Sequence, residues 1–190
     1  MNKKLTAALS GGAALVLALT GCSSDDDSGE KTDAWAKKVC DQVKPQVTKI
    51  QKANASINEA SQQKKSPEEV KKIDSAAFQN ISEAYKALAD AVDDAGEPPV
   101  DKGKKLQTDA VKELRGLSTQ YAGLKTTVDE MSTKDQADFA SGLKELATKL
   151  GKLGKSGDVS LQKLQSGDLG TAMAEQKGCK RPATGAPPSA

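Results

Sequence analysis

The sequence predicts an all-α protein, built as an up-down-up-down four-helix bundle. Four long segments carry apolar residues at steps of three and four, the spacing of one helical face. Runs of alternating β-branched and aromatic residues, which would indicate strands, are missing. The same patterns divide the chain into a signal peptide (1–21), a lipidated cysteine with a flexible tether (22–32), the helical bundle (33–179) and a disordered tail (180–190).

The leader carries the strongest motif of the chain. Residues 1–4 are basic, and residues 5–19 are apolar or small but too few for a membrane-spanning helix, which needs roughly 20 residues. The leader ends on Leu19-Thr20-Gly21-Cys22, the order of a bacterial lipobox, whose cysteine receives a diacylglyceryl group. We therefore expect cleavage before Cys22 and anchoring to the outer face of the cell membrane. The competing interpretation is a plain secretory signal with a coincidental cysteine.

Two cysteines, Cys40 and Cys179, remain once Cys22 is assigned to lipid. A disulfide between them is the expectation, because nothing keeps thiols reduced outside the cytoplasm. The predicted topology also brings the start of the first helix beside the end of the last. The alternative is a metal or redox pair, but the chain has no His and no other soft ligand to complete such a site.

The polar segment 23–32 shows no apolar period, so a flexible spacer is predicted there. Its three consecutive Asp residues lack the alternating pattern of a calcium loop, and ion binding is not expected. The first helix should run from about Asp33 to Gln62, with Pro45 bending or breaking it. Asn54 lies in its stripe as a register-setting or edge residue. The apolar members of that stripe are Ala36, Cys40, Val43, Val47, Ile50 and Ile57.

A capping motif opens the second helix, because Ser66 can cap, Pro67 suits the first turn and Glu69 can complete a capping box. Gly96 and the Pro-Pro pair after it should end that helix. The third helix is predicted from about Asp101 to Met131. Its seam is the most regular of the chain: Leu106, Ala110, Leu114, Leu117, Tyr121, Leu124, Val128 and Met131.

The fourth helix should begin after a cap at Ser132 or Thr133 and continue to Leu164. Glycines at 151, 154 and 157 weaken its middle by up to about 1 kcal/mol each relative to alanine. A break near Gly157 is therefore one option, with a short extra helix over 167–176 before Cys179. The tail 180–190 is rich in Pro, Gly and Ala and is predicted to be disordered.

Charge and composition argue against several functions. Removal of Lys3 and Lys4 with the leader leaves equal numbers of basic and acidic residues, whereas a nucleic-acid binder needs a basic surplus. Without His, acid-base chemistry near neutral pH would need carboxylates, lysines or thiols with shifted pKa values. No catalytic, cofactor-binding or metal-binding residue is assigned, and no cofactor is expected.

Several segments resemble the small secreted lipoproteins of actinobacteria. They are the lipobox, the opening Trp35-Ala-Lys-Lys-Val-Cys40, the segment Tyr121-Ala-Gly-Leu124 and the late Gly178-Cys179 pair. The resemblance implies an exported helical body at the cell membrane with no established activity. It supplies no functional residue beyond Cys22.

Two functions from different classes follow. The first is a non-enzymatic surface lipoprotein that binds an envelope protein or another envelope component through a helical face, with the membrane as its partner through covalent lipid. The alternative is a carrier whose bundle opens around an apolar small molecule or lipid, suggested by the glycines of the fourth segment and by Tyr85 and Tyr121. An envelope hydrolase would be considered only if several carboxylates met in a cleft.

Overall fold

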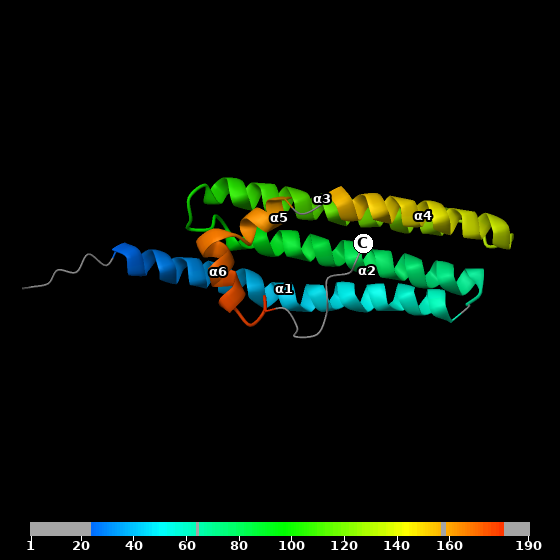
Figure 1. Cartoon of the computed structure of the whole chain (residues 1–190), viewed down its shortest axis with the longest axis horizontal. Helices are drawn as coiled ribbons and strands as arrows, with labels where there is room; N and C mark the ends of the chain where they lie inside the picture. The colour runs from blue at the N-terminus through cyan, green and yellow to red at the C-terminus, as the bar shows by residue number, and fades with distance from the viewer. Residues whose placement is uncertain (1–23, 64, 157–158, 181–190) are drawn as a thin grey trace, which may run out of the picture.

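The computed structural model describes residues 24–63, 65–156 and 159–180, and this part of the chain is all-helical (Figure 1). The predicted signal peptide, the lipobox with Cys22 and residues 181–190 of the predicted tail lie outside the described residues. Six helices occupy the described ranges: α1 (Ser24–Gln62), α2 (Pro67–Ala95), α3 (Gly103–Glu130), α4 (Gln136–Ser156), α5 (Val159–Leu164) and α6 (Gly167–Glu175).

The first four helices run back and forth along the long axis of the molecule (Figure 1). The most extensive packing is between α2 and its two neighbours, α1 and α3, while α4 lies along α3. Of the options for the fourth segment, the one with a break is confirmed: α4 ends at Ser156, α5 begins at Val159, and the short extra helix predicted over 167–176 is α6. The short α5 then packs on α3, and α6 packs on α1. The interruption coincides with the glycine-rich stretch that weakens helix formation.

The core has two parts, and both draw on α1, α2 and α3. Towards the disulfide end, α5 and α6 complete it, with Trp35, Val39, Val92, Leu114, Leu164, Leu169 and Met173 among its buried residues. Towards the other end α4 completes it, with Ala53, Phe78, Ile81, Leu117, Leu124, Val128, Leu146 and Leu153. The core formed by α1, α2 and α3 is therefore covered by α5 and α6 at the disulfide end and by α4 at the opposite end.

The first helix differs from the prediction in two respects. It begins at Ser24, so the segment 24–32 is helical instead of a flexible tether, and it continues through Pro45 without a break. Thr32, the last residue of that segment, is buried beside α6, whereas residues 28–31 are exposed. Pro45 is exposed, so water can reach the carbonyl group that its missing N–H leaves without a partner. The prediction of a spacer overlooked packing partners that are distant in sequence.

Helix boundaries elsewhere follow local chemistry. The predicted capping box of α2 is confirmed, with Ser66 Oγ accepting from the Glu69 amide and Glu69 accepting from the Ser66 amide. The predicted cap of α4 is wrong: the carboxylate of Asp135 accepts hydrogen bonds from the amides of Ala137 and Asp138, at 2.8 and 2.9 Å. A carboxylate is also favoured there by the helix dipole.

The predicted stripe of α3 is confirmed as its core-facing side, and most of the α1 stripe, including Ile50 and Ile57, also packs on the core. Ala53 is buried and Asn54 is exposed, so Asn54 does not set a register inside the core.

Candidate functional site

A disulfide joins Cys40 of α1 to Cys179, which follows α6. The two Cα atoms are 5.1 Å apart although 139 positions separate the residues in sequence. Gly178 makes this approach possible, since a Cβ atom there would lie 1.9 Å from the carbonyl oxygen of Cys40. The structure thus brings together the two cysteines that the sequence paired, and it places α6 beside α1.

A surface cleft of about 470 Å³ lies next to this corner. The first described turns of α1, the α2–α3 connection and α6 form its walls. Hydroxyl groups and four carboxylates dominate the lining. The residues are Ser28, Gly29, Thr32, Asp33, Pro99, Val100, Asp101, Asp168, Thr171, Ala172 and Glu175.

Hydrogen bonds hold the walls of this acidic cleft in place. Thr32 Oγ1 donates to the carbonyl oxygen of Ser28 at 2.9 Å within α1. The indole Nε1 of Trp35 donates to the carbonyl oxygen of Gly96 at 2.8 Å, which ties α1 to the end of α2. Gly96 has φ +80°, a left-handed conformation that favours glycine. The orientation of the Gly96 carbonyl group, which accepts the hydrogen bond from Trp35, therefore depends on having a glycine at this position.

The four carboxylates of the cleft lie on the surface of the protein. Asp33, Asp101, Asp168 and Glu175 are all exposed. Among the described residues, no group of three or more carboxylates and cysteines has the arrangement of a metal site. The cleft is therefore an acidic, solvated surface.

A second hollow, a groove of about 310 Å³, runs between α1 and α2 near the middle of the molecule. Its floor is apolar and its rim is polar, with lining residues Lys49, Lys52, Ala53, Ser56, Ile73, Ala76, Ala77 and Asn80. Lys49 forms an ion pair with Glu83 of α2 at 2.5 Å. The small alanines of both helices leave the groove shallow, with space for a side chain of a bound partner.

The two tyrosines that suggested a ligand cavity pack against each other. The rings of Tyr85 and Tyr121 are stacked with their centroids 5.6 Å apart, and Phe78 lies 6.2 Å from Tyr121. Burial raises the pKa of the Tyr121 phenol above its ordinary value. The three rings join α2 to α3 and contribute to the core of the half that α4 completes.

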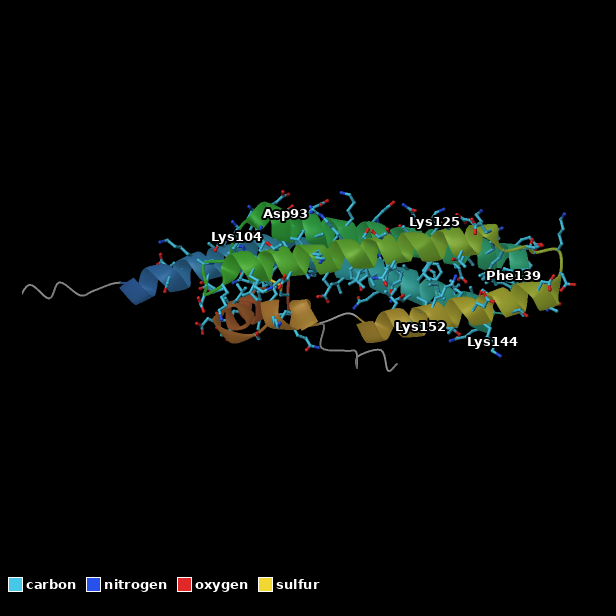
Figure 2. The ribbon with its side chains drawn as sticks, turned by 90° about the horizontal axis from the view of Figure 1, so that it is seen from above. Asp93, Lys104, Lys125, Phe139, Lys144 and Lys152 are labelled. Atoms are coloured by element: carbon cyan, nitrogen blue, oxygen red, sulfur yellow. A yellow bond between two sulfur atoms is a disulfide. The ribbon has the colours of Figure 1, made fainter. Side chains whose placement is uncertain are left out.

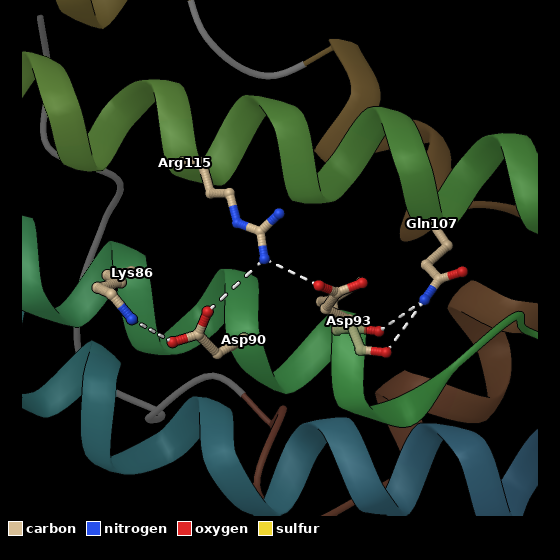
Figure 3. A network of polar contacts seen from close by, with 6 residues as sticks. Lys86, Asp90, Asp93, Gln107 and Arg115 are labelled. Carbon is tan, nitrogen blue, oxygen red and sulfur yellow. Dashed lines mark hydrogen bonds and ion pairs between the residues drawn. The ribbon is translucent and has the colours of Figure 1, made fainter.

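Charged side chains cover the outer faces of the helices, as Lys144 and Lys152 do on α4 (Figure 2). Many of them form pairs within the molecule. Lys105 forms an ion pair with Asp109, one turn later on α3, at 2.8 Å. A larger network links α2 and α3 (Figure 3), where Arg115 contacts Asp93 at 2.8 Å and Asp90 at 3.9 Å.

One buried titratable residue, on the side of α2 that faces the core, was not identified from the sequence. Asp74 is 5% exposed, and its Oδ1 atom has no hydrogen-bond partner. Burial raises the pKa of its carboxyl group from 3.8 to about 6. The spacing could have revealed it, because Asp74 stands four residues after Val70 and four before Phe78, within the apolar face of the helix.

Comparison with protein-family models, with curated proteins and with solved structures finds no match. Within the described residues, no helix combines the length and apolar character needed to cross a membrane. Of the predicted site residues, Cys40 and Cys179 are paired, and Cys22 lies outside the described part of the chain.

Proposed function

We propose that the chain is a non-enzymatic lipoprotein, anchored through acylated Cys22 to the outer face of the cell membrane, whose helical body binds a protein or another envelope component. The disulfide is the observation that carries this proposal. It uses Cys40 and Cys179 and leaves Cys22, in the lipobox, as the third cysteine. Disulfides persist in oxidising compartments, which supports export.

The body we propose is a four-helix bundle whose fourth position is shared between α4 and the α5–α6 pair. A carrier would need an internal cavity for its ligand, whereas interlocked side chains in the core support a role that uses the outer surface of the bundle. Phe78, Leu124 and Leu146, from three different helices, belong to the same buried cluster. The hollows described above are open at the surface and have charged rims, which suits a polar partner better than an apolar ligand.

The anchor is tested by replacing Cys22 with alanine and labelling growing cells with a fatty acid. We expect the wild-type chain to carry the label and to sediment with membranes, and the C22A chain to carry none and to be released. The matched control is the double variant C40A/C179A, which lacks the other two cysteines and should remain labelled and membrane-bound. Membrane retention of an unlabelled C22A chain would contradict the proposal.

The binding surface is tested with photo-crosslinking amino acids at three exposed alanines on different helices: Ala76, Ala122 and Ala147. A binding face should give a discrete crosslinked species in intact cells from one or two of these positions, and not from the third. The same species should disappear when C22A releases the protein from the membrane. Absence of any discrete product from all three positions counts against a binding role.

A further inference from the structure

We propose that the exposed face of α4 is a cationic surface that lies against an anionic phospholipid bilayer. The lysines of this face are Lys144, Lys149 and Lys152, all exposed. Their contact with the membrane orients the anchored body and does not replace the lipid anchor. The inference deepens the proposed function, and it needs acylation of Cys22 only to keep α4 near the bilayer.

The pattern of α4 separates its leucines from its lysines. Leu146 and Leu153 are buried in the core, and Leu143 and Leu150 pack against the same cluster. The three lysines stay outside that buried face, and Lys144 and Lys152 are labelled on the helix in Figure 2. Basic amphipathic helices are typical of membrane surfaces. Because the apolar side of α4 is already buried in the protein, only an electrostatic contact through the lysines remains.

Carboxylates do not neutralise these lysines. Within the described residues none of the three forms an ion pair. Lys149 Nζ instead donates to the hydroxyl group of Thr127 on α3, at 3.3 Å. One and two turns before Thr127, on the same side of α3, stand the uncharged Gly123 and Gln120. Glu145 is the single acidic residue between Lys144 and Lys152, so this face keeps an excess of positive charge.

Other helices also expose lysines, but acidic residues accompany them. Helices α1 and α2 contain more acidic than basic residues, and in α3 the ratio of basic to acidic residues is five to four. Lys37 pairs with Asp41 on α1, and Lys86 pairs with Asp90 on α2. In α4 lysines outnumber carboxylates by four to two. The acidic cleft lies at the disulfide end, in the half of the molecule that α4 does not cover.

The shape of this face favours a bilayer over a small anion. Lys144 and Lys152 are eight positions apart, which is about 12 Å along the helix, and α4 lines neither of the two hollows described above. A small ligand needs a concave site, whereas anionic headgroups can gather separately around each lysine. Ala147, Thr148 and Gly151 between the lysines are small, so the ammonium groups project beyond them towards a flat surface.

Photo-crosslinking to lipid tests this contact. The acylated full-length protein carries a photoreactive amino acid at Ala147 and is placed in vesicles of phosphatidylcholine, with or without phosphatidylglycerol. We expect a lipid adduct that requires phosphatidylglycerol and is lost at high salt, because ions screen exposed charges. The control position is Ala55, which is exposed on α1 about 200° around the helix from the buried Ala53. It faces away from the core and should give little adduct in either vesicle.

The triple variant K144Q/K149Q/K152Q should lower the yield of the Ala147 adduct by about fivefold or more, since each lysine near an anionic surface contributes about that factor. The matched control K44Q/K72Q/K112Q removes three exposed lysines, one each from α1, α2 and α3. It changes the net charge equally and should leave the yield unchanged. Equal losses in the two triple variants would show that net charge, and not the face of α4, governs the contact.

The outcomes separate this contact from the anchor. Mass spectrometry of the chain and flotation with vesicles at high salt test acylation independently of α4. An anchored protein without a phosphatidylglycerol-dependent adduct at Ala147 overturns the contact and leaves the lipoprotein proposal intact. Loss of that adduct when soluble polyphosphate matches the phosphate concentration of the vesicles also overturns it, because the face would then prefer a soluble polyanion. A chain without fatty acid overturns both proposals.

Discussion

The carboxyl group of Asp74 lies in the core without a cationic partner. Lys71, one turn before it on α2, donates instead to the carbonyl oxygen of Met131 at 2.7 Å. On the facing α3, Asp129 is hydrogen bonded to Lys125 and exposed. Desolvation is the cause of the raised pKa of Asp74, so its ionised form destabilises the folded protein.

The contribution of Asp74 to the stability of the protein should fall as the pH rises from about 4 to about 7. The folded state holds the Asp74 proton up to a pKa of about 6, against 3.8 for an unperturbed carboxyl group, so the unfolded state loses its proton first. This difference between the two pKa values lowers the free energy of unfolding by roughly 3 kcal/mol at a pH where Asp74 is ionised in both states. Urea unfolding at several pH values should therefore show D74N to be more stable than wild type at pH 7 and nearly equal at pH 4.

The variant D129N provides the matched control on the facing helix. The hydrogen bond from Lys125 holds the pKa of Asp129 below its ordinary value, so removing its charge should weaken the protein above pH 4 or leave it unchanged. A pH profile for D74N that parallels the wild-type profile would show that Asp74 is not the group responsible.

Gly178 is the position at which a single methyl group should do the most damage beside the disulfide. An alanine Cβ there would lie 1.9 Å from the Cys40 carbonyl oxygen, which is backbone and cannot turn aside. We expect G178A to lower the free energy of unfolding by about 2 kcal/mol or more, in the range of overpacked sites.

The control for this effect is Gly116, a glycine inside α3 whose added Cβ would meet nothing within 4 Å. Alanine stabilises a helix relative to glycine by roughly 1 kcal/mol. In thermal unfolding under oxidising conditions, G116A should therefore melt above wild type and G178A below it. Equal melting temperatures for the two variants would refute the steric explanation.

Pro45 shows how tertiary packing overrides a local helix breaker. The helix continues through it because buried residues on both sides, such as Cys40 and Ala53, hold α1 against its neighbours. The cost of the missing hydrogen bond remains in the folded state.

We therefore expect P45A to raise the free energy of unfolding by roughly 1 to 3 kcal/mol, since alanine restores the amide donor and is the best helix former. Pro67 supplies the comparison, because it stands in the first turn of α2, where the amide has no helical acceptor in any case. P67A should change the chemical denaturation midpoint little. A P45A protein that is less stable than P67A would contradict this interpretation.

The elements differ in how far local sequence specifies them. The start of α2 could be predicted from three residues: Ser66, Pro67 and Glu69. The regular apolar seam predicted for α3 is confirmed by the burial of its residues. The helical start of α1 could not be predicted, since the segment 24–32 has no apolar period and its buried Thr32 lines a cleft together with residues of the α2–α3 connection and α6. A local sequence pattern predicts a helix only where burial of that helix's own apolar face supplies most of its stability.

The disulfide links the last described segment to the first helix and closes a loop of 139 positions. In the chain-entropy model such a loop stabilises the folded state by at most about 5 kcal/mol. α6 has only nine residues, too few for a helix to persist without packing. Its position on α1 should therefore depend on the crosslink more than that of any longer helix.

Reduction of the disulfide should lower the unfolding midpoint and loosen α6 first. Hydrogen exchange measures this, and amides of α6 should lose protection on reduction while those of the central α2–α3 pair keep theirs. The C40A/C179A variant should behave like the reduced protein. Uniform loss of protection across α2, α3 and α6 would instead show that the crosslink stabilises the molecule as one cooperative unit.

The sequence alone determined the helical class, the ends of α2, the seam of α3 and the pairing of Cys40 with Cys179, because each depends on residue spacing or on cysteine number. The tertiary structure decided the packing of α5 on α3 and of α6 on α1, the helical start of α1 and the burial of Asp74. These features depend on contacts between residues far apart in the chain, and their free energy comes from burial against a partner that no local pattern specifies.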